Sequence, residues 1–306
     1  MNVKKLAIGT VQFGLDYGIS NTGGKMSFPE AMRVLSEAEA FGIRLLDTAA
    51  TYGDSEEVVG RYLKDGINPF DIVTKISIGQ REDNDKKNIT AAIDGILQRS
   101  MERLGQNRIY GLLAHSPDDL TGTQGEILWA WMENQKCCGR VEKTGASVYY
   151  PREAIEIMNK YPVDILQIPL SVFDQRMNVS GVIKEAKSRG IEIHCRSVFL
   201  QGLYFMDPRI TGNYFEPVRP FLEEFSGAVS RSGYTMQEVL LGFALSVEGV
   251  DNVIVGVENS RQLVQIIEAA GVTVEGFDWA RWQLDDVRFV VPSNWVLKKH
   301  NKRRDS

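Results

Sequence analysis

The sequence has few of the residues that mark secreted or metal-binding proteins. Its three cysteines, Cys137, Cys138 and Cys195, cannot form a full set of disulfides, and two adjacent cysteines do not have the spacing of zinc ligands. A reduced, cytoplasmic protein is the simplest interpretation. The three histidines, His115, His194 and His300, form no closely spaced pair, so we expect no metal centre and disfavour a metal-dependent hydrolase.

Long apolar runs and a strong charge bias are also missing. No stretch approaches the roughly 20 apolar residues of a membrane-spanning helix, and the apolar run after Lys5 is too short for a secretion signal. Lys plus Arg number 35 against 40 Asp plus Glu, a net charge of −5. We therefore expect neither nucleic acid nor a membrane as a partner, and the sequence does not indicate an oligomeric state.

What the sequence does have is a regular alternation of short β-like runs and amphipathic helical stretches. At 306 residues, eight such units favour a closed (β/α)8 TIM barrel over an open doubly wound sheet. No linker-like segment divides the chain, so we predict one domain over residues 1–306 with a C-terminal tail from about residue 277. The predicted strands are Leu6–Thr10, Ile43–Asp47, Ile72–Ile76, Arg108–His115, Lys143–Ser147, Asp164–Ile168, Ile191–Arg196 and Asn252–Val255.

The helical patterns between these strands are amphipathic, with apolar residues at helical spacing. The last connection before the eighth strand is different, because it is long and aromatic from about Phe199 to Arg219. Long connections in compact domains are often functional, and the aromatic residues favour an ordered loop that lines a pocket. The predicted helices are Pro29–Phe41, Glu56–Lys64, Lys86–Leu104, Glu153–Lys160, Gly181–Arg189 and Ser260–Ala270.

Four polar residues follow three successive predicted strands. Asp47 ends the second strand and Tyr52 lies in the loop after it, while Lys75 and His115 end the third and fourth strands. Active groups of parallel barrels gather at the carboxyl ends of the strands, so we expect these side chains to meet in one site. Asp47 would keep Lys75 charged, and that ammonium would lower the pKa of the Tyr52 phenol. Tyr52 could then donate a proton, and His115 could orient a substrate oxygen.

The runs that carry these residues resemble the signatures of the aldo-keto reductase superfamily. They are D-T-A-A-T-Y-G-D-S-E at 47–56, V-T-K at 73–75 and L-L-A-H-S at 112–116, and the resemblance extends from residue 6 to about 270. It implies NAD(P)H-dependent reduction of an aldehyde or ketone, with sugar-derived carbonyls among the candidate substrates. It also implies that Tyr52 is the general acid, that Lys75 and Asp47 tune it, and that His115 orients the carbonyl.

The same resemblance implies NADPH bound across the barrel mouth without a G-x-G-x-x-G fingerprint, and the sequence contains none. Val148 stands where the family has the Asn of a Ser-Asn pair that holds the carboxamide, which is a departure. The implied contacts are Thr10 and Gln12 near the nicotinamide ribose, Ser147 and Gln167 at the carboxamide, Arg196 at the nicotinamide ring, and Ser197, Leu200 and Gly202 at the pyrophosphate.

The adenosine end corresponds to the eighth strand and the start of the following helix. A helix amino terminus there can bind the 2′-phosphate of NADPH. Glu258 would repel such a phosphate but could accept a hydrogen bond from a free ribose hydroxyl, and Arg261 could compensate. NADPH is therefore the expectation from the family, and NADH stays open. The residues assigned to this end are Gly256, Glu258, Asn259, Arg261 and Gln262.

Substrate-wall residues are assigned from aromatic residues near the predicted mouth: Tyr17, Tyr204 and Trp295. The basic run at 298–304 is either a solvated tail or a clamp for an anionic substrate. Two other functions compete with a reductase. A Schiff-base aldolase would use Lys75 as its nucleophile. A non-catalytic redox-sensing subunit would keep the four residues and bind the cofactor without turnover.

Overall fold

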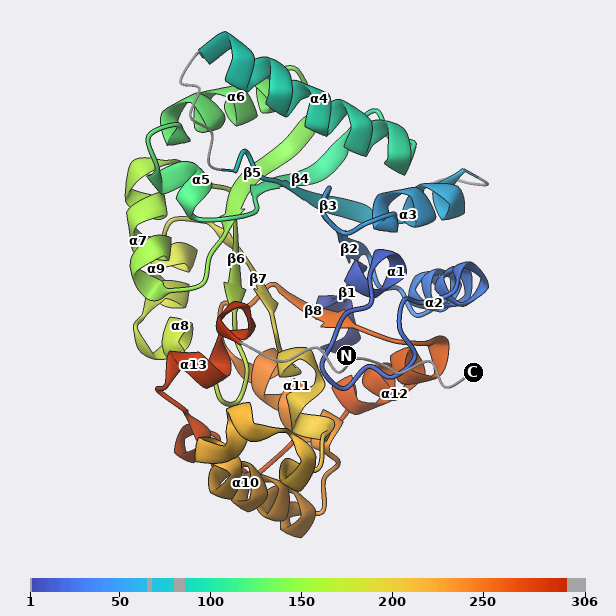
Figure 1. Ribbon diagram of the computed structural model, residues 1–306, viewed down its shortest axis with the longest axis vertical. Coiled ribbons are helices and arrows are strands. Elements are labelled where there is room, and N and C mark those ends of the chain that lie inside the picture. Colours follow the sequence, from blue (N-terminus) through green and yellow to red (C-terminus); the bar gives the residue numbers. More distant parts are fainter. Residues whose placement is uncertain (1, 65–67, 80–85, 296–306) are drawn as a thin grey trace.

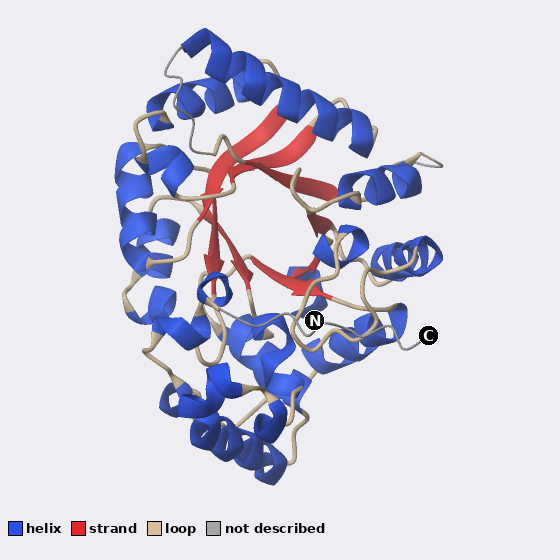
Figure 2. Cartoon of the chain, viewed as in Figure 1, coloured by secondary structure: helices blue, strands red, loops and turns tan. Residues whose placement is uncertain are grey.

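The computed structural model describes residues 2–64, 68–79 and 86–295. Eight parallel strands close into a barrel in sequence order, with β1 paired to β8, and helices surround the barrel (Figures 1 and 2). The predicted (β/α)8 fold is confirmed. The strands are β1 (Leu6–Gly9), β2 (Leu45–Asp47), β3 (Asp71–Ile76), β4 (Ile109–Ala114), β5 (Val141–Ser147), β6 (Ile165–Pro169), β7 (Glu192–Arg196) and β8 (Asn252–Gly256).

The strands alternate between two apolar environments. Residues facing outward join the large core between the strands and the helices. Residues facing inward form a separate small layer inside the barrel, which fills it with side chains rather than leaving a pore. This layer consists of Ala7, Leu45, Val73, Leu113, Ile165 and Ile254.

The helices pack on the barrel through one apolar face each. In α4, Ile89, Ile93, Leu97 and Met101 recur at every fourth position and are buried, which is the spacing of one helix face. The helices are α1 (Val11–Gly14), α2 (Phe28–Ala40), α3 (Ser55–Leu63), α4 (Lys86–Leu104), α5 (Asp118–Thr121), α6 (Gly125–Cys137), α7 (Pro151–Lys160), α8 (Arg176–Val179), α9 (Val182–Ser188), α10 (Arg219–Ser232), α11 (Met236–Ser246), α12 (Ser260–Ala270) and α13 (Val287–Val290).

The connection between β7 and β8 is the longest, as the sequence predicts. It contains three 3-10 turns, Leu200–Phe205, Pro208–Ile210 and Asn213–Val218, before α10 and α11. Helix α10 lies farthest from the barrel in Figure 1. Strand β7 and this connection therefore lead from the barrel rim to an outlying helical part of the same chain.

The chain after residue 276 packs against this outlying part. The Trp279 indole nitrogen donates to the Val239 carbonyl over 3.2 Å, and the buried Trp282 ring lies edge-on to Phe225. The basic run at 298–304, with His300, lies outside the described residues. In the described part of the chain, no helix is long and apolar enough to cross a membrane.

Candidate active site

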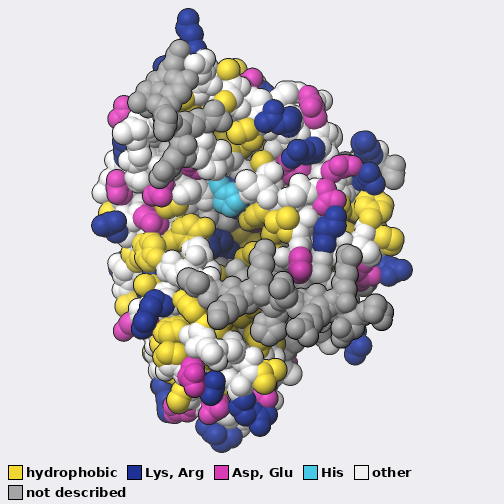
Figure 3. Space-filling view, viewed as in Figure 1, with side chains coloured by type: hydrophobic (Ala, Val, Ile, Leu, Met, Phe, Trp, Pro, Cys, Tyr) yellow, Lys and Arg dark blue, Asp and Glu magenta, His cyan; other side chains and the backbone are white. Residues whose placement is uncertain are grey.

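A cavity of about 720 Å³ opens at the carboxyl ends of the strands. Asp47, Tyr52 and His115 line it together, as expected from their strand-end positions. Figure 3 shows this face of the molecule, where hydrophobic side chains surround a histidine and a basic side chain near the centre. A concave site with a few convergent polar groups is the usual form of a small-molecule site.

Asp47 and Lys75 form a buried ion pair beneath the cavity. Lys75 Nζ lies 2.7 Å from Asp47 Oδ2 and donates a second bond of 3.0 Å to the Thr48 carbonyl. Register explains the contact, because Asp47 pairs with Val73 on β3, two residues before Lys75. Burial lowers the pKa of Lys75, and the Asp47 carboxylate opposes that shift. Both side chains are almost fully buried, so each charge depends on the other for its compensation.

The loop that carries Tyr52 is fixed by close backbone packing. A side chain on Gly14 would place its Cβ 1.8 Å from the Tyr52 carbonyl oxygen, so only glycine allows α1 to lie against this loop. Gly53 follows with φ of +59°, a conformation that favours glycine. Ser55 Oγ then donates to the Thr10 carbonyl over 2.8 Å. These contacts hold Tyr52 at the rim.

The same packing gives Thr10 a structural role. Its hydroxyl donates to the Asp47 carbonyl over 3.1 Å and lies 2.7 Å from Ser55 Oγ, whose single proton is shared between the hydroxyl and carbonyl oxygens of Thr10. The side chain is fully buried and, among the described residues, is not part of the cavity wall. Thr10 therefore anchors the Tyr52 loop to β1 through its buried hydroxyl.

Tyr52 lies beside both Lys75 and His115. Lys75 Nζ is 5.1 Å from the centre of the Tyr52 ring, and the Tyr52 and His115 rings meet edge-on with centres 5.8 Å apart. Burial raises the pKa of Tyr52, the Asp47 carboxylate raises it further, and Arg196 lowers it. The pKa of Tyr52 is therefore raised and not lowered as expected, and Lys75 is not among the charges that shift it. The cation that acts on the phenol is Arg196.

His115 directly follows β4 and is uncharged at neutral pH. Burial lowers its pKa to about 4, and the nearby Lys75 ammonium adds to the shift. Its Nδ1 lies 3.3 Å from the Thr51 hydroxyl. When that hydroxyl donates to Nδ1, the ring proton is on Nε2, which leaves one imidazole donor for another partner.

A chain of hydrogen bonds joins the ion pair to β5, β6 and β7. Gln167 Nε2 donates to Asp47 Oδ1 over 2.7 Å, and Ser147 Oγ donates to Gln167 Oε1 over 3.4 Å. Arg196 Nε donates to Ser147 Oγ over 3.4 Å. Arg196 also lies over the Tyr149 ring, with Cζ 4.5 Å from its centre. Gln167, Ser147 and Arg196 all line the cavity.

Val148 does not supply the amide that the family has at this position. Its side chain is fully buried, and its carbonyl accepts a 3.0 Å bond from Arg196. Arg196 thus uses the backbone of the position where an Asn side chain was expected. The guanidinium is fixed from three sides, by Ser147, Val148 and Ser197.

The loop after β7 has an unusual backbone. Ser197, Leu200 and Gln201 have φ of 65°, 43° and 53°, and Gly202 has 91°. Left-handed residues other than glycine are uncommon and concentrate at functional sites. Ser197 and Gly202, which the family resemblance assigns to the pyrophosphate, line the cavity. The Leu200 side chain is fully buried in the core and faces away, so any part it plays comes from its backbone.

At the opposite wall, β8 and α12 supply the remaining predicted residues. Gly256, Glu258 and Gln262 line the cavity, and Gln12 packs so closely on Gly256 that a Cβ there would lie 2.5 Å from its amide nitrogen. Asn259 instead caps α12, accepting from the Gln262 backbone over 2.9 Å. The described cavity wall includes neither Asn259 nor the exposed Arg261.

Of the three predicted substrate-wall residues, only Tyr17 lines the cavity. The Tyr204 hydroxyl is buried and bonded to Ser171 Oγ and the Phe173 backbone, so its ring belongs to the core. Trp295 packs edge-on against Phe215 and is likewise absent from the described wall. The position of Tyr204 in the core is the clearer departure from the expected wall.

Sequence reasoning missed several residues of the cavity wall. Tyr149 comes two residues after the end of β5 and could have been found from that position. The others come from elements whose approach depends on tertiary packing, and they carry no local signal. They include Gln201, Gln237, Gln265, Pro292 and Ser293.

The family model of the Aldo/keto reductase family matches residues 5–283. The chain belongs to the aldo/keto reductase family. The match confirms the family expected from the sequence. This family comprises NAD(P)H-dependent oxidoreductases that act on carbonyl compounds.

Individual relatives of this aldo/keto reductase are distant. An aldo-keto reductase of Strobilurus tenacellus is 30% identical over 195 residues, which cover 61% of this chain and 54% of that protein. A holo aldo-keto reductase of Bacillus halodurans has a TM-score of 0.71 at 20% identity, covering 91% of this chain and 89% of its own. A glycerol dehydrogenase of Gluconobacter oxydans has a TM-score of 0.69 at 22% identity, with coverages of 94% and 92%.

Proposed function

We propose that this aldo/keto reductase reduces an aldehyde or ketone with hydride from a reduced nicotinamide dinucleotide, and that Tyr52 protonates the carbonyl oxygen. One observation carries the proposal. The Tyr52 phenol lines the cavity beside His115 and directly above the buried Lys75–Asp47 pair. A proton donor beside the cavity is what an alkoxide formed there requires.

The described residues fit the dinucleotide. Gln12 Oε1 is buried with no hydrogen-bond partner among the described residues, at a wall where a bound group could supply one. Ser147 and Gln167 present hydroxyl and amide groups suited to a carboxamide, and Arg196 offers a flat cation above Tyr149. When bound, the reduced nicotinamide supplies the hydride.

The protonation states support Tyr52 as an acid. Burial and Asp47 raise the pKa of Tyr52, so the phenol keeps its proton at neutral pH and can give it to a more basic alkoxide. His115 is uncharged, since its pKa is about 4, and can donate one hydrogen bond to the same oxygen. The buried pair of Lys75 and Asp47 then fixes the floor beneath Tyr52.

The Schiff-base alternative is disfavoured by access. Lys75 Nζ is almost fully buried and bonded to Asp47 and the Thr48 carbonyl, and the described cavity wall does not include it. A carbonyl substrate in the cavity would have to displace both partners to reach the amine. Trapping with borohydride and a carbonyl compound should therefore give no adduct at Lys75.

The direct test is consumption of a reduced nucleotide by the purified protein in the presence of carbonyl compounds. The panel should contain apolar aldehydes and ketones as well as sugar-derived carbonyls, because Tyr17, Phe199 and Phe205 give the cavity aromatic walls. We expect oxidation of bound nucleotide within a single turnover for some member of the panel. Tight binding without oxidation by any member would instead favour a non-catalytic, redox-sensing protein.

A further inference from the structure

Two carboxylates lie at the amino end of α12, and one of them, Glu258, lines the cavity. Glu258, just before the helix, lines the cavity together with Gln262 and Gln265. Glu30 reaches the same helix end from α2, which lies beside α12 (Figure 1). Glu30 Oε1 accepts a 2.7 Å hydrogen bond from the Ser260 backbone N–H. The amino end of a helix attracts anions, and at α12 the Glu30 carboxylate already occupies that position.

Glu30 is held in place as a charged group. Its second oxygen, Oε2, accepts a 2.7 Å bond from Arg33. The hydrogen bond from Ser260 lowers the pKa of Glu30, so the side chain is ionised at neutral pH. The Arg33 charge is used within this pair and does not offset Glu258.

Other donors at this helix end are also committed. The Glu258 backbone N–H donates to Gln262 Oε1 over 2.8 Å, and the Gln262 N–H donates to Asn259 Oδ1 over 2.9 Å. Arg261 is exposed, and the described cavity wall does not include it. An anion arriving here would meet the Glu258 carboxylate at the cavity wall and the Glu30 carboxylate at the helix end, and the backbone N–H groups of Glu258, Ser260 and Gln262 already have partners.

We propose that this wall makes the protein select NADH over NADPH, an inference that rests on the proposed function because it needs a nicotinamide dinucleotide in the cavity. A 2′-phosphate adds a charge of roughly −1.5 to −2 at neutral pH, and Glu258 and Glu30 repel it. A free 2′-hydroxyl is neutral and donates a hydrogen bond to a carboxylate such as Glu258. The same side chains therefore disfavour one nucleotide and accept the other.

Equilibrium binding tests this without requiring turnover. NADH and NADPH are titrated separately into the wild-type protein, and quenching of tryptophan fluorescence gives each Kd. We expect the Kd for NADH to be lower by about tenfold or more, since like charges side by side weaken binding by such factors. Equal Kd values, or a lower value for NADPH, overturn the selectivity while leaving the reductase proposal intact. No binding of either nucleotide contradicts the proposed function itself.

Two substitutions assign the selectivity to the carboxylates. Glu258→Gln keeps the shape and removes the charge, so the Kd for NADPH should fall about tenfold and that for NADH should change by about threefold or less. Glu30→Gln should shift the ratio in the same direction by less, because Arg33 is left without its partner. Glu268→Gln is the matched control, an exposed residue two turns along α12 and outside the cavity wall.

The variants give a clear decision. If Glu258→Gln and Glu30→Gln leave the ratio of the two Kd values at its wild-type level, as Glu268→Gln should, the carboxylates do not select the nucleotide. Thermal unfolding of each variant checks folding. Glu258→Gln alone decides the question if loss of the Ser260 contact unfolds the Glu30 variant.

Discussion

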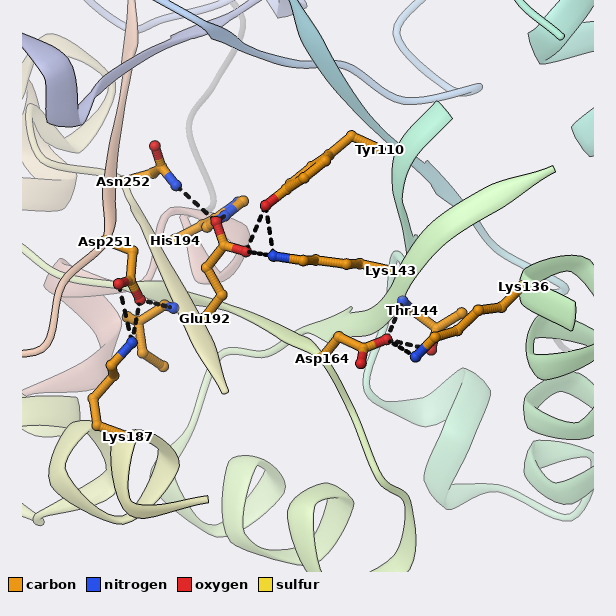
Figure 4. Close-up of polar contacts among 11 residues, drawn as sticks. Tyr110, Lys136, Lys143, Thr144, Asp164, Lys187, Glu192, His194, Asp251 and Asn252 are labelled. Atoms are coloured by element: carbon orange, nitrogen blue, oxygen red, sulfur yellow. Dashed lines mark hydrogen bonds and ion pairs between the residues drawn. The ribbon is translucent and has the colours of Figure 1, made fainter. Parts of the chain in front are cut away.

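The two ends of the barrel contain the same kinds of side chain, an acid, a phenol, a lysine and a histidine, in different states. At the carboxyl ends of the strands the set is Asp47, Tyr52, Lys75 and His115. At the amino ends it is Glu192, Tyr110, Lys143 and His194, shown in Figure 4. The inward-facing apolar layer of the barrel lies between the strand positions of the two sets.

In the set at the amino ends, Glu192, Tyr110 and Lys143 are bonded to one another. Lys143 Nζ donates to Tyr110 Oη over 2.6 Å and to Glu192 Oε2 over 2.5 Å, and Tyr110 Oη donates to the same carboxylate oxygen over 2.8 Å. Although burial opposes it, hydrogen bonds from His194 and Lys143 hold the pKa of Glu192 at about 2. Every polar group of Tyr110, Lys143 and Glu192 has a partner within the set, so these residues stabilise the barrel.

The set at the carboxyl ends is left open. No hydrogen bond to the Tyr52 hydroxyl is formed by any described residue, and the ring borders the cavity of about 720 Å³. Lys75 bonds to Asp47 and a backbone carbonyl instead of to the phenol. Residue types alone therefore do not make a catalytic site. A hydroxyl without a protein partner, facing space for a substrate, distinguishes the two ends.

The largest expected effect comes from removing that hydroxyl. Tyr52→Phe deletes the proposed proton donor without changing the ring, so kcat should fall by about 10²- to 10⁴-fold while nucleotide Kd stays within about twofold. Steady-state kinetics and fluorescence titration measure the two quantities. A variant with near-native kcat would show that the proton comes from another group.

Lys75→Met tests the ion pair below the phenol. It leaves the buried Asp47 carboxylate without its cation, so the free energy of unfolding should drop by about 3–5 kcal/mol, and kcat should fall as well. Denaturant unfolding and kinetics are the measurements. Lys143→Met, at the other end, should cost only about 1–2 kcal/mol because Glu192 keeps its bonds to Tyr110 and His194, and kcat should not change. Equal loss of kcat in both variants would contradict the division between the ends.

Acid should weaken the two ends over different pH ranges. The folded-state pKa of His115 is about 4, below its ordinary 6.5, so the unfolded chain binds more protons and stability is lost as pH falls from 6.5 toward 4, by up to about 3 kcal/mol. The folded-state pKa of Glu192 is about 2, below 4.5, so its contribution is lost only as pH falls from 4.5 toward 2. In His115→Gln, the free energy of unfolding should change less with pH between 6.5 and 4, and its change between pH 4.5 and 2 should stay as in the wild type. An unchanged slope between pH 6.5 and 4 would refute this assignment.

The sequence predicts the reaction end of the site better than its walls. Asp47, Lys75 and His115 lie where strand ends were expected, and the strand-end rule brings them together because parallel strands share one rim. Helix Ser260–Ala270 has the predicted bounds, because Asn259 caps it and apolar residues recur at helical spacing. These features depend on local pattern and on one topological rule.

The remaining features depend on contacts between distant segments. Glu30 meets Ser260 across 230 residues, and that contact follows only once closure of the barrel places α2 beside α12. Tyr204 is an aromatic residue in the loop that was expected to line the pocket, but its hydroxyl is bonded to Ser171 in the core. The raised pKa of Tyr52 also depends on such contacts. Burial is its largest cause, and the burial of a side chain cannot be deduced from its position in the sequence.

The smallest expected effect is that of Tyr110→Phe, and it gives the most direct comparison of the two ends. Tyr110→Phe removes the same atom as Tyr52→Phe from the same kind of cluster, but Lys143 and Glu192 stay in contact over 2.5 Å without it. Stability should therefore fall by only about 1 kcal/mol, measured by denaturant unfolding, and kcat should match the wild type. If Tyr110→Phe instead lowers kcat, the apolar layer between the sets does not isolate them, and the closed cluster has to be counted among the groups that position Tyr52.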